Sequence, residues 1–266
     1  MGRAAEALVF AEASDLMDEL ARLGLSDCFQ RAARSTACAQ PAIFCVTVAK
    51  ARRHLQFGMP QFAAGHSLGE YSALVTAGAL DALTGLRLVV RRGSLMQKAV
   101  RSCLPSGMLA VRASASDVAE VLRDLPALTI ANDNGPRQVV IAGELRALDK
   151  AAKKLRALRM HHTRLMVSGA FHHPIMTPAL ACMASALREV EFGNPLFTVM
   201  SGLTARPFEN IPEELLAGII TRVRWRETMR WLLDAGATRF VDLGPGHALA
   251  RLARESVEGD PRIEVI

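Results

Sequence analysis

The chain has 266 residues, of which half are hydrophobic and 22% are charged, so a disordered or fibrous protein is excluded and one large or two modest folded domains are expected. The net charge of +6 admits a nucleic acid as partner, but only 13 residues are aromatic and no basic stretch is interleaved with them, so we expect no nucleic-acid binding and favour an acidic protein or a phosphate-bearing small molecule. No apolar run reaches 18 residues, and the early acidic residues argue against a signal or transit peptide, so we expect no membrane association.

The first 100 residues are predicted to be mainly helical around one short strand. Helix-forming residues fill 4–23, and Gly24 is a plausible stop. Pro41 predicts the start of a second helix that continues to Leu55. The elements expected next are a strand at 62–64, a glycine-containing turn at 65–69, and helices at 70–77 and 83–100.

From Gly107 the hydrophobic period changes. The elements expected there alternate as strand, helix, strand, strand, helix and strand, at 108–112, 116–125, 127–131, 138–142, 144–158 and 161–166. That order is the split ferredoxin-like unit, and the polar cluster at 132–136 is predicted to be a turn within it. We therefore expect a ferredoxin-like small domain at 105–166, inserted into a large domain made of 1–104 and 167–266.

The remaining segments again alternate between helices and strands. The elements expected are a helix from Pro174, a strand at 196–201, helices within 212–235, a strand at 239–243 and a helix from His247. Such alternation predicts an α/β fold with a mainly parallel sheet covered on both faces. The five cysteines are far apart and form no CxxC pair, so neither a zinc site nor a disulfide framework is supported, and a reducing cytoplasm is the expected setting.

The strongest chemical signal is Gly65-His66-Ser67-Leu68-Gly69, which has the G-x-S-x-G form between a predicted strand and a predicted helix. A nucleophilic serine needs such a sharp turn, because the turn lifts the hydroxyl out of the sheet edge and lets the following N–H groups face an oxyanion. On the local pattern, the two glycines permit the tight backbone. An ordinary strand-to-helix turn with Ser67 as a buried cap is the alternative.

The segment from Gly65 to Leu74 resembles the nucleophile segment of malonyl-CoA:acyl-carrier-protein transacylases and of the related polyketide synthase acyltransferase domains. Segments matching the same family recur in order along nearly the whole chain: Gln40-Pro41-Ala42, Arg92-Gly93 with Met96-Gln97, 138–143, Ala170-Phe171-His172, Val223-Arg224-Trp225 and Gly244-Pro245-Gly246. The resemblance implies a hydrolase-like large domain with a parallel sheet and the inserted small domain. It also implies transfer of malonyl from malonyl-CoA to the phosphopantetheine thiol of an acyl carrier protein, for fatty acid or polyketide synthesis. Coenzyme A enters only as the substrate thioester, no cofactor is expected, and we expect a monomer.

The same resemblance assigns the catalytic residues. It implies that His172 activates Ser67, that an acyl-enzyme forms on Ser67, and that the Leu68 N–H contributes to the oxyanion hole. A hydrolase triad of Ser67, Asp242 and His247 is the alternative from chain order, but a helix beginning at His247 disfavours its imidazolium. In this family a backbone carbonyl, not a carboxylate, orients the histidine, and counting back from Trp225 places that carbonyl near Gly218. The other histidines make no plausible metal set.

Substrate contacts are also implied by the resemblance. Arg92 is expected to grip the free carboxylate of malonate, with a solvated helix arginine as the alternative. Phe171 matches malonyl-selective polyketide acyltransferases, where a bulky ring crowds a methyl branch, although Gly169 departs from the histidine often found two residues earlier. His66 and Asn134 complete the substrate-binding candidates. Their alternatives are a structural role for His66 and turn chemistry for Asn132 and Asn134.

One family feature is not found in this sequence. Members normally begin with a strand and a Gly-Gln-Gly-Ser-Gln loop, and Met1-Gly2 resembles the residues just beyond that loop. On this expectation the sheet lacks a central strand and the oxyanion hole lacks its second donor, a loss worth on the order of 10²–10³ in rate. A serine hydrolase of acyl thioesters and a truncated or inactive homologue acting as a docking protein are therefore kept as rival functions.

The predicted helix at 144–158 is a candidate docking face for the carrier. Basic residues cluster on it and beside it: Arg146, Lys150, Lys153, Lys154, Arg156, Arg159 and Arg164. Spacings of three and four place Arg146, Lys150, Lys153 and Lys154 near one helical face. An acidic carrier protein would be attracted to such a face, and a simple solvated face is the alternative.

Overall fold

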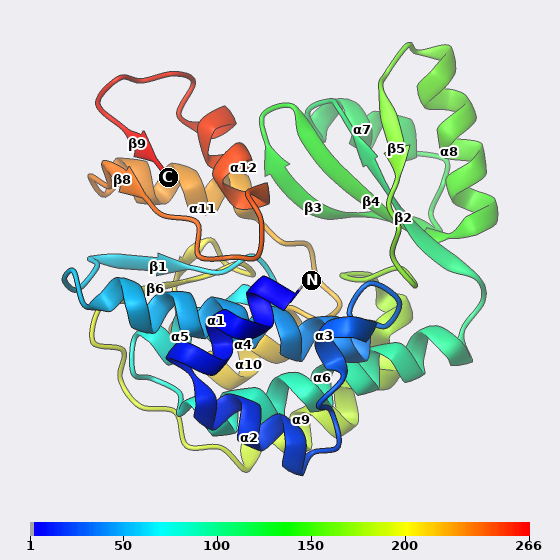
Figure 1. Ribbon diagram of the computed structural model, residues 1–266. Coiled ribbons are helices and arrows are strands. Elements are labelled where there is room, and N and C mark those ends of the chain that lie inside the picture. The colour runs from blue at the N-terminus through cyan, green and yellow to red at the C-terminus, as the bar shows by residue number, and fades with distance from the viewer. Residues whose placement is uncertain (1–2) are drawn as a thin grey trace.

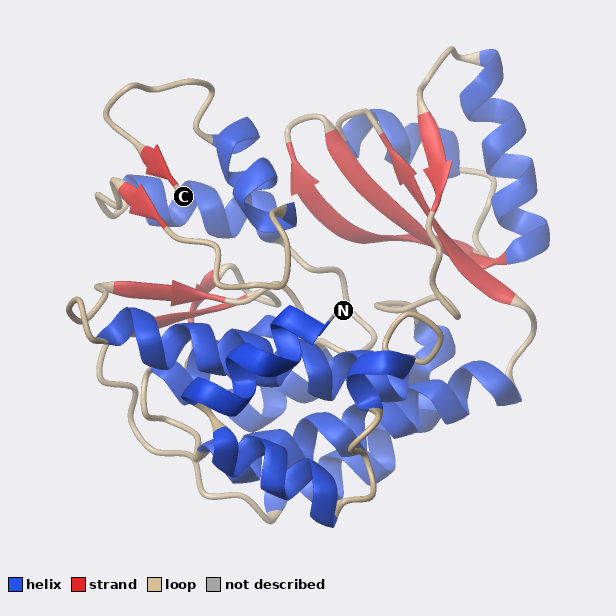
Figure 2. Ribbon diagram, viewed as in Figure 1, coloured by secondary structure: helices blue, strands red, loops and turns tan. Residues whose placement is uncertain are grey.

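The structure is a computed structural model that describes residues 3–266 (Figure 1). Helices and strands are mixed along the whole chain, as Figure 2 shows, so the predicted α/β class is confirmed. A thick layer of helices lies beneath a small sheet, a C-terminal group of helices and short strands lies above that sheet, and a separate four-stranded sheet with two helices projects to one side. No described helix is long and apolar enough to cross a membrane.

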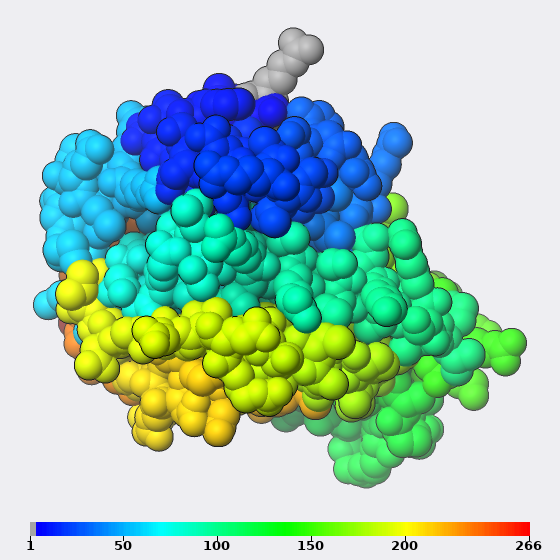
Figure 3. All heavy atoms as spheres, turned by 90° about the horizontal axis from the view of Figure 1, so that it is seen from below, coloured from blue at the N-terminus to red at the C-terminus, as the bar shows by residue number. Residues whose placement is uncertain are grey.

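The helical layer is built around two long helices that pack against each other, α4 and α6. Its members are α1 (Arg3–Glu12), α2 (Ser14–Arg22), α3 (Cys28–Arg31), α4 (Thr36–Leu55), α5 (Gly69–Thr76), α6 (Ala82–Ser102), the 3₁₀ helix η1 (Pro174–Ala179), α9 (Leu180–Arg188) and α10 (Ile211–Ala217). A Cβ added at Gly93 of α6 would lie only 3.1 Å from the Ala37 Cα of α4, so glycine permits this close approach. Seen from below in Figure 3, the N-terminal helices, α6 and the α9 region cover this face.

Two predicted helix boundaries in this layer are wrong. The expected helix 4–23 breaks at Ala13, which is buried and leaves helical geometry so that α1 can pack on α4 while α2 packs on α6. The second helix begins at Thr36, five residues before Pro41. A distant side chain stabilises that earlier start, because Gln97 Oε1 accepts hydrogen bonds from the Ala37 N–H and the Ser35 hydroxyl.

The large sheet is smaller and less parallel than predicted. Strand β1 (Phe62–Ala64) pairs in parallel with β6 (Thr198–Ser201), and β6 pairs antiparallel with β7 (Arg206–Pro207). A second parallel pair, β8 (Arg239–Phe240) and β9 (Glu264–Val265), forms a separate sheet. Side chains from both sheets, among them Phe62 and Phe240, belong to one hydrophobic cluster, in which Phe62 of β1 packs edge-on against Trp231 of α11 (Trp225–Asp234). The last helix is α12 (Ala248–Ser256).

The projecting sheet has the ferredoxin-like order that the sequence predicts. Its elements are β2 (Ser106–Val111), α7 (Ala115–Leu122), β3 (Leu128–Gly135), β4 (Gln138–Glu144), α8 (Leu145–Ala157) and β5 (His162–Arg164), and the strands lie in the order β3-β4-β2-β5 with every pair antiparallel. Helices α7 and α8 bury one face of the sheet. The opposite face packs against the segment that contains Ala170 and Phe171.

The predicted turn at 132–136 is wrong. Strand β3 continues to Gly135, and the turn lies at Pro136 and Arg137. Asp133 can stay in a buried strand because it finds partners: its carboxylate binds the Arg226 guanidinium of α11, and its N–H donates to the Val223 carbonyl. Through these bonds the edge of β3 is tied to the large part of the molecule. The domain boundaries at 104/105 and 166/167 stay predictions.

Candidate active site

Ser67 occupies a sharp turn between β1 and α5. Its backbone has φ of +56°, a left-handed conformation that is uncommon for a residue with a side chain. The turn brings β1 so close to α5 that a Cβ added at Gly65 would lie 2.0 Å from the Glu70 nitrogen, so only glycine fits there. Gly69 is different, because nothing lies within 4 Å of its added Cβ. The tight backbone therefore needs Gly65 and not both glycines.

The Ser67 hydroxyl lies between two basic side chains. Its Oγ is 2.8 Å from His172 Nε2 and 3.0 Å from Arg92 Nη2. The serine comes from the β1–α5 turn, the arginine from α6, and the histidine from the loop that runs between β5 and η1. The structure thus brings together three residues that the sequence predicts for the site.

His172 is buried, and it too has a left-handed backbone, with φ of +57°. Its Nδ1 lies 2.8 Å from the Gly218 carbonyl oxygen and 3.1 Å from the Thr221 carbonyl oxygen. Since carbonyl oxygens only accept hydrogen bonds, Nδ1 carries the proton, and in a neutral ring Nε2 is left free to accept the Ser67 hydroxyl proton. The predicted carbonyl near Gly218 is confirmed, and Thr221 adds a second one.

The surroundings of His172 keep it neutral. Burial, followed by the positive charge of Arg92 and by His66, lowers the pKa of His172 to about 3. A neutral imidazole next to a serine hydroxyl is the form that a general base requires. Catalytic residues are commonly found with shifted pKa values and unusual backbone conformations, and His172 has both.

Arg92 is a buried cation whose hydrogen bonds go only to neutral side chains. Its Nη1 donates to Gln40 Oε1 at 2.6 Å and its Nη2 donates to Ser67, while its Nε has no partner among the described residues. Its guanidinium lies 5.8 Å from the centre of the Tyr71 ring. The neighbouring Arg91 is exposed, as expected for a solvated helix arginine, whereas Arg92 is buried. A buried cation without an anion is costly, and this one is placed to receive a carboxylate.

Leu68 directly follows Ser67, and Phe171 directly precedes His172. Within residues 3–266 the Leu68 N–H donates to no acceptor, which leaves it available to an oxyanion near Ser67. Phe171 is partly buried and packs against the core beneath the small sheet. A Cβ added at Gly169 would lie 2.3 Å from a methyl carbon of Val100, so the histidine common in the resembled family does not fit this backbone.

His66 and Asn134 contact each other across the two parts of the molecule. His66 Nε2 lies 2.8 Å from Asn134 Oδ1, and the His66 ring lies 5.5 Å from the Trp225 ring. Burial lowers the pKa of His66, so the ring is neutral and its Nε2–H donates to the amide oxygen. The pair joins β3 to the serine turn, which places Asn134 near the site although it lies in a strand and not in the predicted turn.

The alternative triad of Ser67, Asp242 and His247 is not assembled. Asp242 accepts hydrogen bonds from the backbone N–H groups of Gly244 and Ala250, and His247 is exposed at the start of α12. His173 is also occupied, because its Nδ1 accepts the Ile175 N–H and caps η1. Among the residues that the structure describes, no group of histidine, cysteine and acidic side chains could hold a metal ion.

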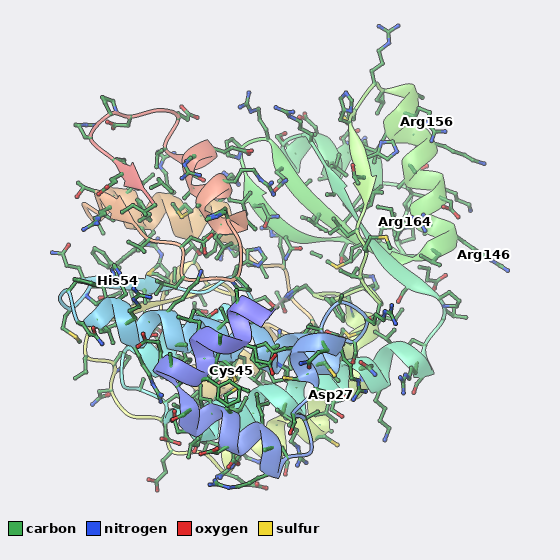
Figure 4. All side chains as sticks on the ribbon, in the orientation of Figure 1. Asp27, Cys45, His54, Arg146, Arg156 and Arg164 are labelled. Atoms are coloured by element: carbon green, nitrogen blue, oxygen red, sulfur yellow. The ribbon has the colours of Figure 1, made fainter. Side chains whose placement is uncertain are left out.

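The basic helix α8 lies away from this site. It covers the face of the small sheet opposite the one that meets Ala170 and Phe171. In Figure 4, Arg146 and Arg156 extend outward from α8, away from the rest of the chain. Lys150 and Lys153 are exposed, whereas Lys154 is paired with Asp124. A carrier bound to the predicted docking face on α8 would therefore lie on the outer side of the small sheet, away from Ser67.

Two residues near the site were not assigned a role from the sequence. Gln40 is buried and accepts a hydrogen bond from Arg92, which orients the guanidinium. In the sequence the Gln40-Pro41-Ala42 segment served only as a match to the resembled family and did not indicate this contact. Glu70 directly follows the serine turn and is buried beside it. A buried acidic residue next to a nucleophile was a signal that could have found it.

Comparisons with known proteins show the family to which the chain belongs. The family model described as acyl transferase domain matches residues 4–260. The polyketide biosynthesis malonyl CoA-acyl carrier protein transacylase BaeC of Bacillus velezensis is 39% identical over 220 residues, which make up 80% of this chain and 75% of that protein. Other curated relatives are much longer polyketide biosynthesis proteins, and the chain spans only 19% of one and 28% of another.

Solved structures show the same arrangement. The malonyl CoA-acyl carrier protein transacylase from Coxiella burnetii has a TM-score of 0.88 and 28% identity, covering 95% of this chain and 84% of that one. A malonyl-transacylase in complex with a type II polyketide synthase acyl-carrier protein has a TM-score of 0.87 and 29% identity, covering 97% of this chain and 86% of that one. Both alignments include the small sheet as well as the serine turn, since they cover nearly the whole chain.

Proposed function

The chain belongs to the acyl transferase domain family, and from that premise we propose that it transfers malonyl from malonyl-CoA to the phosphopantetheine thiol of an acyl carrier protein. Ser67 is the nucleophile and His172 the general base. Leu68 supplies an oxyanion N–H and Arg92 holds the malonyl carboxylate. Phe171, His66 and Asn134 line the acyl and thioester side of the site.

In the first half-reaction Ser67 Oγ attacks the thioester carbonyl carbon. The hydroxyl proton passes to His172 Nε2, which already lies 2.8 Å away. The carbonyls of Gly218 and Thr221 stabilise the resulting imidazolium by accepting from Nδ1. The carbon–sulfur bond then breaks, and His172 returns the proton to the departing coenzyme A thiolate. The product is a malonyl ester on Ser67.

The second half-reaction runs through the same groups in reverse. His172 takes the proton of the carrier thiol, and the thiolate attacks the ester carbonyl. The bond between Ser67 Oγ and the acyl carbon breaks, and His172 reprotonates the serine. No oxidant, metal or further cofactor enters this balance, because each bond that forms is matched by one that breaks and the proton is returned.

The observation that carries the choice of acyl group is the unpaired charge of Arg92. The side chain is 4% exposed, and both of its hydrogen bonds go to neutral groups. Burial lowers the pKa of Arg92, while Tyr71 and Glu70 raise it, and this direction supports a site in which a substrate anion adds to the compensation of its charge. A malonyl carboxylate would supply the missing anion next to Ser67, whereas an uncharged acetyl group would leave the cation unpaired.

The test is to supply malonyl-CoA with and without an acyl carrier protein. Rapid malonyl-carrier formation with slow release of free malonate is expected. If free malonate is released as fast as the carrier is loaded, the chain is a thioester hydrolase instead. If intact mass spectrometry of a folded sample shows no malonyl adduct, the docking-protein reading replaces both. The name of the relative from Bacillus velezensis favours polyketide synthesis as the pathway, and fatty acid synthesis is the alternative.

The setting of the reaction is part of the same proposal. We place the protein in the cytoplasm as a monomer, with malonyl-CoA and the carrier as its partners. All five cysteines are free thiols in the described structure, as a reducing compartment favours. Size-exclusion chromatography with light scattering would contradict the monomer if the mass exceeded one chain.

A further inference from the structure

Glu70 is a buried acidic residue that the transfer reaction does not use directly. It lies in the first turn of α5, three residues after Ser67, and is 7% exposed. Its Oε1 accepts the backbone N–H of Gly202 at 2.8 Å. Gly202 follows β6, so this hydrogen bond ties the helix that carries the nucleophile to a distant part of the chain.

The Glu70 carboxyl lies between the two ends of the segment from Gly218 to Arg224. At one end, Gly218 is near the carboxyl, since a Cβ added at Gly218 would lie 3.9 Å from Glu70 Oε2. At the other end, the Arg224 N–H donates to the Gly202 carbonyl at 2.8 Å, and Gly202 is itself held by Glu70. One side chain thus lies near one end of the segment and is linked through Gly202 to the other.

The segment held in this way contains the two carbonyls that orient His172. Gly218 and Thr221 both accept from Nδ1, and neither carbonyl is held in regular secondary structure. A shift of the segment by a fraction of an ångström would turn the imidazole and lengthen its contact with Ser67. Reactions of this type are sensitive to such displacements.

We propose that Glu70 is a positioning residue, which fixes the Gly218–Thr221 carbonyls and so aligns His172 with Ser67. This inference rests on the proposed function, because it assumes that Ser67 and His172 carry out the chemistry. In a hydrolase triad the acid orients the histidine by a direct hydrogen bond. Glu70 instead positions the carbonyl segment, which in turn orients His172, and Glu70 does not contact the ring.

The environment of Glu70 gives the proposal a measurable signature. Burial raises the pKa of Glu70 to about 8, while the Gly202 N–H and Arg92 of α6 lower it and Glu214 of α10 raises it. Strands β1 and β6 contain no titratable residue, and the α4 cations Lys50 and Arg52 bind Gly244 and Asp15 instead. We therefore expect Glu70 to be mostly protonated at neutral pH and to ionise in the alkaline range. The charge that then forms in a buried position is expected to attract water and to loosen the segment.

The experiment measures the rate of Ser67 malonylation between pH 5.5 and 9.5 in the wild type, Glu70→Ala and Glu70→Gln. Glu70→Ala is expected to lower kcat at least tenfold while the KM for malonyl-CoA changes less than twofold, because the Arg92 contact is untouched. Glu70→Gln keeps the shape and the acceptor for Gly202. It is expected to restore most of the rate lost in Glu70→Ala and to remove the decline of the wild type above pH 8.

Glu214→Gln is the matched control. Glu214 is another buried carboxyl, but its side chain accepts the N–H groups of Glu209 and Asn210 at the start of α10. Its substitution is expected to leave kcat near neutral pH unchanged. Because Glu214 raises the pKa of Glu70, the alkaline decline should move to slightly lower pH and not disappear as it does in Glu70→Gln. Thermal melting of all variants separates loss of fold from loss of alignment, and Glu70→Gln still tests the proposal if Glu70→Ala does not fold.

Two results overturn the proposal. The first is a decline of the rate above pH 8 in Glu70→Gln that equals the decline of the wild type. The second is a combination of two findings: kcat and KM change in parallel in Glu70→Ala, and kcat in Glu70→Gln equals that of the wild type at every pH. A fluorophosphonate probe that labels active serines distinguishes this failure from failure of the proposed function. If wild-type Ser67 reacts with the probe but not with malonyl-CoA, the function is wrong, and the pH profile of probe labelling then tests Glu70.

Discussion

Ser67 and His172 are 105 positions apart in the chain, yet they share a 2.8 Å hydrogen bond and nearly identical left-handed backbone conformations, with φ of +56° and +57°. Each such conformation costs roughly 1–3 kcal/mol for a residue with a side chain. The surrounding structure must hold both residues in place against that cost. The coincidence of strain and contact identifies this pair as the centre of the site.

Ser67→Ala is expected to abolish the malonyl adduct, because no other hydroxyl group in the described part of the chain is hydrogen-bonded to His172. Intact mass spectrometry after exposure to malonyl-CoA measures it. Ser72→Ala is the matched control, since Ser72 is buried in α5, the helix that follows Ser67, and its hydroxyl has no partner among the described residues. Equal labelling of the wild type and Ser67→Ala would remove the nucleophile assignment.

We expect kcat/KM not to fall near neutral pH through protonation of His172. An ordinary histidine with a pKa near 6.5 would be mostly protonated at pH 5, and the rate would fall roughly 30-fold. The pKa of His172 is lowered to about 3, so the base stays free as the pH falls to 5 and is lost only as the pH approaches that value. A rate that stays within about twofold between pH 5 and 7.5 is expected. A half-maximal rate near pH 6.5 would contradict the buried, neutral His172.

Arg92→Ala is expected to weaken malonyl transfer and to favour acetyl transfer relatively. Losing a charged hydrogen bond costs ~1.5–3 kcal/mol, which corresponds to roughly 10- to 150-fold in kcat/KM. Competition between malonyl-CoA and acetyl-CoA gives the ratio. Arg91→Ala, at the exposed neighbour, is expected to leave the ratio unchanged. An unchanged ratio in Arg92→Ala would make Arg92 a structural residue.

Gly65→Ala and Gly69→Ala should differ sharply in stability. A methyl group at position 65 would overlap the backbone of α5 at 2.0 Å, and the backbone has no room to retreat, so a loss of at least about 3 kcal/mol is expected. At position 69 the methyl group meets open space, and the free energy of unfolding should stay within about 0.5 kcal/mol of the wild type. Urea unfolding measures both. Equal destabilisation would contradict the geometry of the turn.

Charge reversal on α8 tests long-range attraction of the carrier. Lys150→Glu with Lys153→Glu changes two exposed residues, whereas Lys154 is paired with Asp124 and is left intact. Because α8 lies on the outer face of the small sheet, its charges act by steering and not by contact. The carrier half-reaction should slow roughly threefold to tenfold at low salt and recover at high salt.

The matching measurement is Ser67 acylation by malonyl-CoA, which should be unaffected by the double reversal. A loss in both half-reactions would point to a damaged fold. No change in either at low salt would move the docking face elsewhere, and Arg137 and Arg251, which line one cavity, are the next pair to reverse.

The sequence by itself determined the order of elements and the identity of the central residues. Hydrophobic periodicity is a local property, so it located the strand–turn–helix around Ser67 and the ferredoxin-like order of the small sheet. The resemblance then selected His172 and Arg92, and counting from Trp225 indicated the Gly218 carbonyl. These predictions depended on the number of residues between motif positions, which is the same in the unfolded and the folded chain.

Only the tertiary structure decided where polar groups find their partners. Strand β3 runs through Asp133 and Asn134 because Arg226 and His66, far away in sequence, satisfy their side chains. In the same way, Gln97 moves the start of α4 to Thr36. Local propensity cannot foresee such bonds, because a buried polar residue is tolerated only when a partner is present in space. For the same reason the role proposed for Glu70 follows from its contacts and not from its place in the motif.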